Sequence, residues 1–232
     1  MQKLKMQKLK MQQLVIILTI VLTLSYMMWH MMRGHKVPTL ILIPNNHVTL
    51  KYCKNFLSEN FCDTIIKKMD DKKFVKSSIT FGDDDFCTSK TTSLPSTAPL
   101  AKILNEKICD ILQIDPMYGE ELQIHKYDRH DQFKDHTDYF SKDVEVEMDH
   151  IKQNGQRTWT FMIYLNDVEK GGHTDFKLLN LSIKPEKGMA LAWYNLKEDS
   201  EIEGNHYTVH AELPVEAGNK YVITKWFKSN SV

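Results

Sequence analysis

The first strong pattern in the chain is an almost uninterrupted apolar run from Leu14 to Met32. About 20 apolar residues in a helix are long enough to cross the hydrocarbon core of a bilayer. Lysines precede this run at four positions, whereas only Arg33 and Lys36 follow it closely. The positive-inside tendency then keeps the amino end cytoplasmic. We therefore predict a basic cytoplasmic tail over residues 1–13, a transmembrane signal anchor over 14–32 and a linker over 33–46.

A cleaved signal peptide is the alternative interpretation of the same segment. The stretch from Met27 to Met32 lacks the small residues that suit cleavage, which favours an uncleaved anchor. The expected arrangement is a single-pass membrane protein whose remaining residues lie on the lumenal side, in the endoplasmic reticulum.

Beyond the linker, the hydrophobic pattern changes from helical to strand-like. A short strand is expected over residues 48–53, and apolar residues at helical spacing predict helices over 58–70 and 98–114. Later apolar runs, separated by turn residues, predict strands over 120–127, 158–165, 179–183, 189–193, 206–212 and 220–227. This order is typical of a mainly β domain over residues 47–232, with a double-stranded β-helix (jelly roll) core and the helices packed on one sheet. The polar segment 141–154 is expected to be a mobile loop.

Composition narrows the functional classes only slightly. The chain has 30 basic and 30 acidic residues, so no excess of positive charge indicates a nucleic-acid surface. Its four cysteines lack the spacing of zinc ligands and allow up to two disulfides in a lumenal protein, in three connectivities. Buried free thiols are the alternative, particularly for Cys62 and Cys109 within the expected helices.

Candidate metal ligands are His136 and Asp138, which flank Thr137, and the distant His210. Residues two apart on an extended strand face the same side, so His136 and Asp138 can reach one ion while Thr137 points away. Two imidazoles and one carboxylate can occupy one face of an octahedral ferrous ion and leave three positions open. This donor set predicts a non-haem iron site.

Two competing assignments exist for these ligands. A second triplet, His173 to Asp175, follows a Gly-Gly turn signal and is closer to His210 in sequence, which favours a loop. His206 competes with His210, but four residues of strand separate them by about 13 Å, so both cannot bind one ion. The spacing from His210 to the following Pro-Val and lysine favours His210.

The last apolar run places Lys220, Thr224 and Trp226 on one face. An ammonium directed inward among apolar residues needs a partner, and the carboxylate of an acidic small molecule would supply one. Tyr127 and Tyr164 lie in other strands, where a tyrosine is usually a packing residue. The position of Tyr127 shortly before His136 favours a site role, whereas Tyr164 either packs or lines the pocket.

These segments resemble the catalytic domains of prolyl 4-hydroxylases. The resemblance rests on residues 122–127, the His-x-Asp nine residues after Tyr127, residues 155–168, residues 171–176 and the closing segment 210–220. It implies that His136, Asp138 and His210 bind Fe(2+) and that Lys220 pairs with a carboxylate of the cosubstrate 2-oxoglutarate. Tyr127 and Thr224 would lie beside that cosubstrate.

The resemblance further implies hydroxylation of peptidyl proline with O2, coupled to decarboxylation of 2-oxoglutarate to succinate. L-ascorbate would keep the iron reduced, and a proline-containing peptide or protein would be the substrate. The chain departs from the family at Glu212-Leu213, where Gly-Cys is usual, and it matches the family's Arg-Thr-Ser-Ser-Gly run only loosely at residues 90–94. Hydroxylation of another side chain, such as lysine, and a catalytically silent membrane-tethered binding module are the alternatives.

Overall fold

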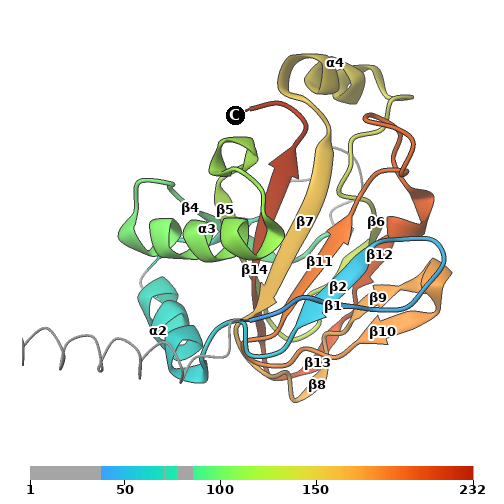
Figure 1. The fold of residues 1–232 in the computed structure, drawn as a ribbon. Coiled ribbons are helices and arrows are strands. Elements are labelled where there is room, and N and C mark those ends of the chain that lie inside the picture. Colours follow the sequence, from blue (N-terminus) through green and yellow to red (C-terminus); the bar gives the residue numbers. More distant parts are fainter. Residues whose placement is uncertain (1–37, 71, 78–85, 232) are drawn as a thin grey trace, which may run out of the picture. The chain divides into compact units, whose positions relative to one another are not determined.

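The computed structural model describes residues 38–70, 72–77 and 86–231 (Figure 1). The predicted tail, the transmembrane anchor and the first residues of the linker lie outside them. No helix within the described ranges has the length and apolar character needed to cross a membrane. The segment Pro38–Val232 forms one compact unit, which includes the later part of the predicted linker.

The largest sheet is antiparallel throughout and carries most of the core. Its strand order is β1 (Ile41–Leu42), β2 (Leu50–Cys53), β11 (Ala190–Tyr194), β7 (Arg157–Tyr164), β14 (Lys220–Lys228), β5 (Leu122–Tyr127), β4 (Lys90–Leu94) and β3 (Val75–Lys76). The central strand β14 is buried along its whole length, between β7 and β5. Residues far apart in the sequence are therefore held in a fixed register across this sheet.

A four-stranded antiparallel sheet lies beside the large one (Figure 1). Its order is β10 (Leu181–Ile183), β9 (Thr174–Phe176), β12 (His210–Glu212) and β6 (Phe133–His136). A separate pair is formed by β13 (Val215–Ala217) and β8 (Lys170–Gly171). These sheets agree with the mainly β, jelly-roll architecture that the sequence predicts.

Strand alternation divides the core into two apolar clusters. On β7, Phe161 and Ile163 belong to the cluster beneath the helices, whereas Met162 and Tyr164 belong to the cluster on the other face of the sheet. The helical side is covered by α2 (Glu59–Asp70) and α3 (Pro99–Leu112), as predicted (Figure 1). The other face turns toward the small sheet and carries the candidate site.

Several local expectations were wrong. Residues 145–154 form helix α4 (Glu145–Asn154), although the segment was expected to be a loop. Only Ile151 of this helix is buried, so the apolar pattern of the helix is weak. The Glu147 carboxylate accepts a hydrogen bond from the backbone N–H of Ser141, which precedes the helix. Ile103 is one of the apolar residues at helical spacing in α3, but it is exposed. The expected strand 206–212 begins with a 3-10 turn, η3 (His206–Thr208).

Two further short turns are η1 (Pro116–Tyr118), between α3 and β5, and η2 (Lys177–Leu179), between β9 and β10. The four cysteines are all free and buried, so the described residues contain no disulfide. This outcome matches the alternative of buried thiols.

Candidate metal centre

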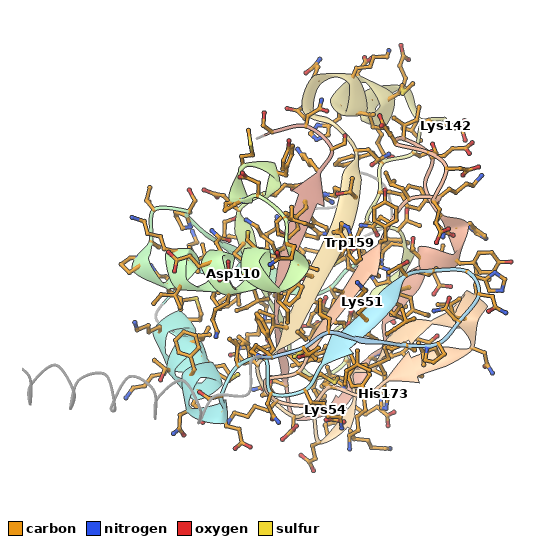
Figure 2. All side chains as sticks on the ribbon, in the orientation of Figure 1. Lys51, Lys54, Asp110, Lys142, Trp159 and His173 are labelled. Atoms are coloured by element: carbon orange, nitrogen blue, oxygen red, sulfur yellow. The ribbon has the colours of Figure 1, made fainter. Side chains whose placement is uncertain are left out.

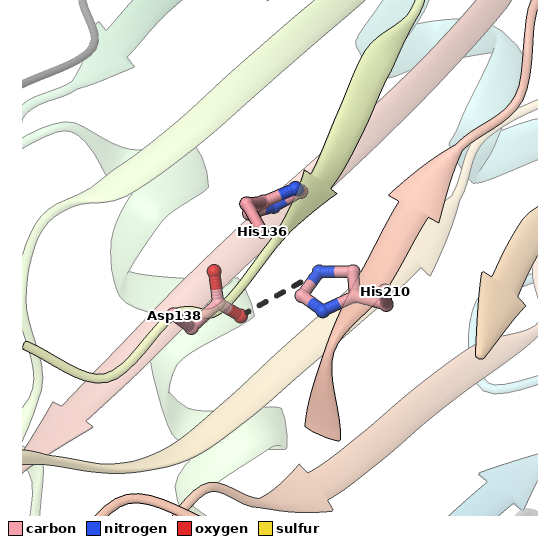
Figure 3. Close-up of side chains that lie close together, drawn as sticks. All are labelled: His136, Asp138 and His210. Carbon is pink, nitrogen blue, oxygen red and sulfur yellow. Dashed lines mark ion pairs between the residues drawn. The ribbon is translucent and has the colours of Figure 1, made fainter. Parts of the chain in front are cut away.

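The structure brings His136, Asp138 and His210 together (Figure 3). One possible ligand atom from each lies within 4.8 Å of the others. His136 and His210 are direct partners across β6 and β12, and Asp138 follows β6 two residues after His136. Antiparallel pairing therefore joins the two separated pieces of the motif.

Both imidazoles are oriented by backbone carbonyls. Nδ1 of His136 lies 2.8 Å from the Lys134 oxygen, and Nδ1 of His210 lies 2.9 Å from the Thr208 oxygen. With Nδ1–H donating to a carbonyl, Nε2 of each ring is an acceptor available to a metal ion. His210 Nε2 lies 4.0 Å from Oδ2 of Asp138.

Aromatic packing fixes the ring planes. His136 is stacked on Phe133, with ring centroids 3.6 Å apart and an angle of 10° between the planes. His210 lies against Phe176 and Trp193, with centroid distances of 5.5 and 4.9 Å. The imidazoles consequently have little rotational freedom.

The Asp138 carboxylate is held by two polar side chains behind it. Thr160 on β7 donates its hydroxyl to Oδ2 at 2.6 Å, and the Asn195 amide donates to the Thr160 oxygen at 2.9 Å. All three residues are buried. This chain of hydrogen bonds directs the carboxylate toward the two histidines.

The electrostatics match a divalent cation. Burial, with repulsion from His210, lowers the pKa of His136 to about 3, so its imidazole is neutral near pH 7. Burial raises the pKa of Asp138, but His210, His136 and the Thr160 hydrogen bond outweigh it, so the pKa is lowered and the group is ionised. Neutral imidazole nitrogens beside one carboxylate form the donor set of ferrous oxygenase sites. The residues present therefore fit an iron(II) ion.

A cleft of about 710 Å³ opens at these donors. Tyr127 and Thr224, which are expected beside a cosubstrate from the family resemblance, both line it, and so does Trp226. Tyr164 does not line this cleft: it is fully buried, and its hydroxyl donates to Thr174 at 2.6 Å.

Lys220 is fully buried at the start of β14, opposite Tyr127 on β5. Its ammonium donates to the carboxylate of Glu212 and, at 2.7 Å, to the carbonyl oxygen of Gly172. Burial lowers the pKa of Lys220, and Glu212 opposes this effect. Lys220 points inward, as expected. Its partner in the structure is the Glu212 side chain of the same chain.

Comparison with known proteins identifies the domain type. A family model described as the 2OG-Fe(II) oxygenase superfamily matches residues 122–228. Prolyl 4-hydroxylase subunits alpha-1 of Gallus gallus and Homo sapiens are each 38% identical to the chain, over 131 and 130 residues. These matches cover 56% and 55% of this chain, but only 24% and 23% of the two subunits. Residues 122–228 thus match an oxygenase domain of the 2OG-Fe(II) superfamily, and the chain is similar in sequence to prolyl 4-hydroxylases.

Two viral proteins resemble the oxygenase domain over a larger share of their length. A putative prolyl 4-hydroxylase of Acanthamoeba polyphaga mimivirus is 29% identical over 174 residues, which cover 75% of this chain and 72% of that protein. The viral collagen prolyl hydroxylase of Paramecium Bursaria Chlorella virus-1, solved as a 2OG complex, has a TM-score of 0.63 at 25% identity. That match covers 78% of this chain and 96% of the solved chain. A Pseudomonas putida prolyl-4-hydroxylase, at 15% identity and a TM-score of 0.54, shares the fold.

The competing ligands lie outside the metal-binding cluster of the oxygenase domain. His173, labelled in Figure 2, and Asp175 flank the first residue of β9, so this triplet enters a strand where a loop was expected. His206 is the first residue of η3 and is exposed. His173, Asp175 and His206 are therefore not part of the cluster of His136, Asp138 and His210.

Sequence reasoning missed four site residues of the oxygenase domain: Glu120, Thr160, Thr174 and Glu212. Glu212 was detectable, because it lies two residues after His210 on an expected strand and so shares its face. Thr160 shares a face with Met162 and Tyr164 in the same way. Glu120 gave no sequence signal, since its role depends on Arg157.

Arg157 is the first residue of β7. It lines the cleft and forms a bidentate ion pair with Glu120, with N–O distances of 2.7 and 2.9 Å. Its guanidinium also lies over the rings of Trp226 and Phe140, 4.1 and 4.9 Å from their centroids. These contacts make Arg157 a rigid part of the cleft wall.

Proposed function

We propose that this chain is an iron(II)- and 2-oxoglutarate-dependent dioxygenase that hydroxylates peptidyl proline. The observation that carries the proposal is the convergence of two imidazoles and one carboxylate, from His136, His210 and Asp138, in the wall of one cleft. The matched segment covers only 24% and 23% of the alpha-1 subunits that the chain resembles, so their complete activity and partners extend beyond this comparison.

His136, Asp138 and His210 would hold the ion on one face, which leaves its other positions to the cleft. When bound, iron and 2-oxoglutarate supply the oxidising power, because decarboxylation of the cosubstrate to succinate activates O2. The protein supplies position and a dry surrounding. Tyr127 and Thr224 both line the cleft, which supports a role for them beside the cosubstrate.

The peptide would enter past Arg157 and Trp226. The planar Arg157 side chain is fixed by Glu120, so it forms a wall that loses little conformational entropy when a ligand binds. The Trp226 indole N–H has no hydrogen-bond partner within the described part of the chain. Because this N–H is buried, Trp226 contributes its apolar ring surface to the cleft wall.

The direct test is mass spectrometry of proline-rich and collagen-like peptides after incubation with the full chain, Fe(2+), 2-oxoglutarate and O2. The expected product carries one added oxygen atom on proline, with one succinate formed for each hydroxylation. The Asp138→Ala variant serves as the background. Modification of lysine instead of proline, or none with peptides of either class, would contradict the proposal.

We also propose that ascorbate sustains turnover and that residues 14–32 anchor the domain on the lumenal side of the endoplasmic reticulum membrane. The support for the anchor is the apolar run behind a lysine-rich tail. The only glycosylation sequon begins at Asn180, which is exposed in the structure. Translation with microsomes should protect the domain from protease and give a glycan-dependent mass shift that Asn180→Gln removes. Digestion without detergent would refute this orientation.

A further inference from the structure

The position beside the Lys220 ammonium is already filled by a carboxylate of this chain. Glu212 and Lys220 are both buried, and their side chains form a direct ion pair. Thr174 donates to the same carboxylate, 2.9 and 3.1 Å from its two oxygens, and accepts from the Tyr164 hydroxyl. The Glu212 carboxylate is therefore fully engaged, and Lys220 has a counter-charge without any ligand.

Glu212 reaches this position because of its place on β12. It lies two residues after His210, so both side chains face the interior. Glu212 also lines the cleft that contains the metal donors, whereas Lys220 does not. Glu212, and not Lys220, is therefore the member of this ion pair that belongs to the cleft wall.

The resemblance described above implies that Lys220 pairs with a carboxylate of 2-oxoglutarate and that glycine is usual at the position of Glu212. A glycine has no side chain to occupy the space beside the ammonium. In this chain, a second carboxylate that approaches Lys220 would meet the Glu212 charge, and like charges in a buried site repel strongly. One buried ammonium cannot neutralise both groups.

We propose that Glu212 is a built-in competitor of 2-oxoglutarate: its carboxylate occupies the anion position at Lys220 and Thr174, and the cosubstrate must displace it. This inference rests on the proposed function and names the residue that sets cosubstrate affinity. Its consequence is a weaker preference for a 2-oxo acid with a second carboxylate. Removing the Glu212 side chain should restore that preference.

The test is isothermal titration calorimetry on the full chain without O2, loaded with Mn2+, which accepts the same nitrogen and oxygen donors. Two ligands are compared: 2-oxoglutarate, and 2-oxopentanoate, which has the same carbon chain but no second carboxylate. The variants are Glu212→Gly and Glu212→Gln. Glu216→Gln is the matched control, because Glu216 is an exposed carboxylate four residues further on, paired with Lys170 at the surface.

We expect Glu212→Gly to favour 2-oxoglutarate over 2-oxopentanoate by about tenfold or more relative to the wild type, since one competing buried charge is gone. Glu212→Gln should shift the ratio in the same direction by less, because the amide still fills the space. Glu216→Gln should leave the ratio unchanged. The melting temperature should respond in parallel, with 2-oxoglutarate raising it more in Glu212→Gly than in the wild type.

The outcomes separate this inference from the proposed function. If both ligands bind and the ratio is the same in the wild type and both Glu212 variants, Glu212 is only a structural partner of Lys220 and the inference fails alone. If Mn2+ binds but neither wild type nor variant binds either 2-oxo acid, the proposed function fails as well. Should Glu212→Gly not fold, the ratio measured with Glu212→Gln decides the question.

Discussion

The hydroxyl of Thr160 on β7 donates to the Asp138 carboxylate at 2.6 Å, and both groups are buried. Thr160 belongs to the large sheet, whereas Asp138 lies two residues beyond the end of β6, the edge strand of the small sheet. This single hydrogen bond therefore aligns a candidate metal ligand with the central sheet. The hydrogen bond uses Oδ2 of Asp138, so Oδ1 is not engaged by Thr160.

We expect Thr160→Val to weaken Mn2+ binding by about 10- to 100-fold, because groups that orient metal ligands typically contribute that much. The Mn2+ dissociation constant of the full chain measures this effect. Thr158→Val is the matched control: Thr158 lies on the same strand, but its hydroxyl donates to the Phe227 carbonyl. Equal affinity in both variants would show that the Thr160 contact does not orient Asp138.

Each of His136→Ala, Asp138→Ala and His210→Ala should abolish Mn2+ binding and succinate formation, since a facial site with two donors holds the ion poorly. His173→Ala and Asp175→Ala should retain most of both, because these residues lie outside the cluster. Metal binding by calorimetry and succinate production measure the two properties. Loss of metal with the His173 variant, but not with the His136 variant, would reverse the assignment.

The Lys220–Glu212 pair predicts a large non-additive effect on stability. Lys220→Ala leaves the Glu212 carboxylate buried without its counter-charge, which should cost about 3–5 kcal/mol of unfolding free energy. Replacing both residues, as Lys220→Met with Glu212→Leu, should recover most of this loss, since an apolar pair can substitute for a buried ion pair. Urea denaturation of the full chain without ligand measures the difference.

The control for the Lys220 and Glu212 replacements is the exposed ion pair between Lys54 and Glu186. Lys54→Ala should cost no more than about 1 kcal/mol, because solvent screens the charges. A Lys220→Ala variant as stable as Lys54→Ala would mean that the buried pair contributes little.

The loss of folding stability at acid pH should depend on Glu120. Burial raises the pKa of this carboxyl, but the hydrogen bonds and charge of Arg157, with Lys228 and His150, outweigh it and lower the pKa below 4.5. A lowered pKa in the folded state contributes stability above the unfolded value and loses it as pH falls through the folded value. Glu120→Gln should therefore reduce stability at pH 7 by about 1–3 kcal/mol and flatten its decline below about pH 4.5.

Chemical denaturation from pH 7 to pH 3 gives both quantities. Glu121→Gln is the neighbouring control, because Glu121 is exposed and has no ion pair with Arg157. A decline for Glu120→Gln as steep as that of the wild type would contradict the role of the Arg157 contact.

The sequence predicted the features that depend on strand alternation and spacing. The large strands, the two helices and the convergence of His136 with His210 follow from residues two apart facing the same side. Helix α4 was missed because one buried residue gives too weak a periodicity. The partner of Lys220 was also missed, because the choice between Glu212 and an outside carboxylate depends on side-chain distances across three strands.

The candidate site combines residues from strands that differ in their resistance to local unfolding. Its Lys220, Thr224 and Trp226 side chains come from β14, which is buried between two strands over its whole length. Its metal donors come from β6, an edge strand, and from the three-residue β12. Local opening favours short, exposed elements, so amide hydrogens of β6 should exchange with solvent well before those of β14. A ligand that bridges the two regions would slow exchange mainly on the β6 side, where the fold alone holds the chain least.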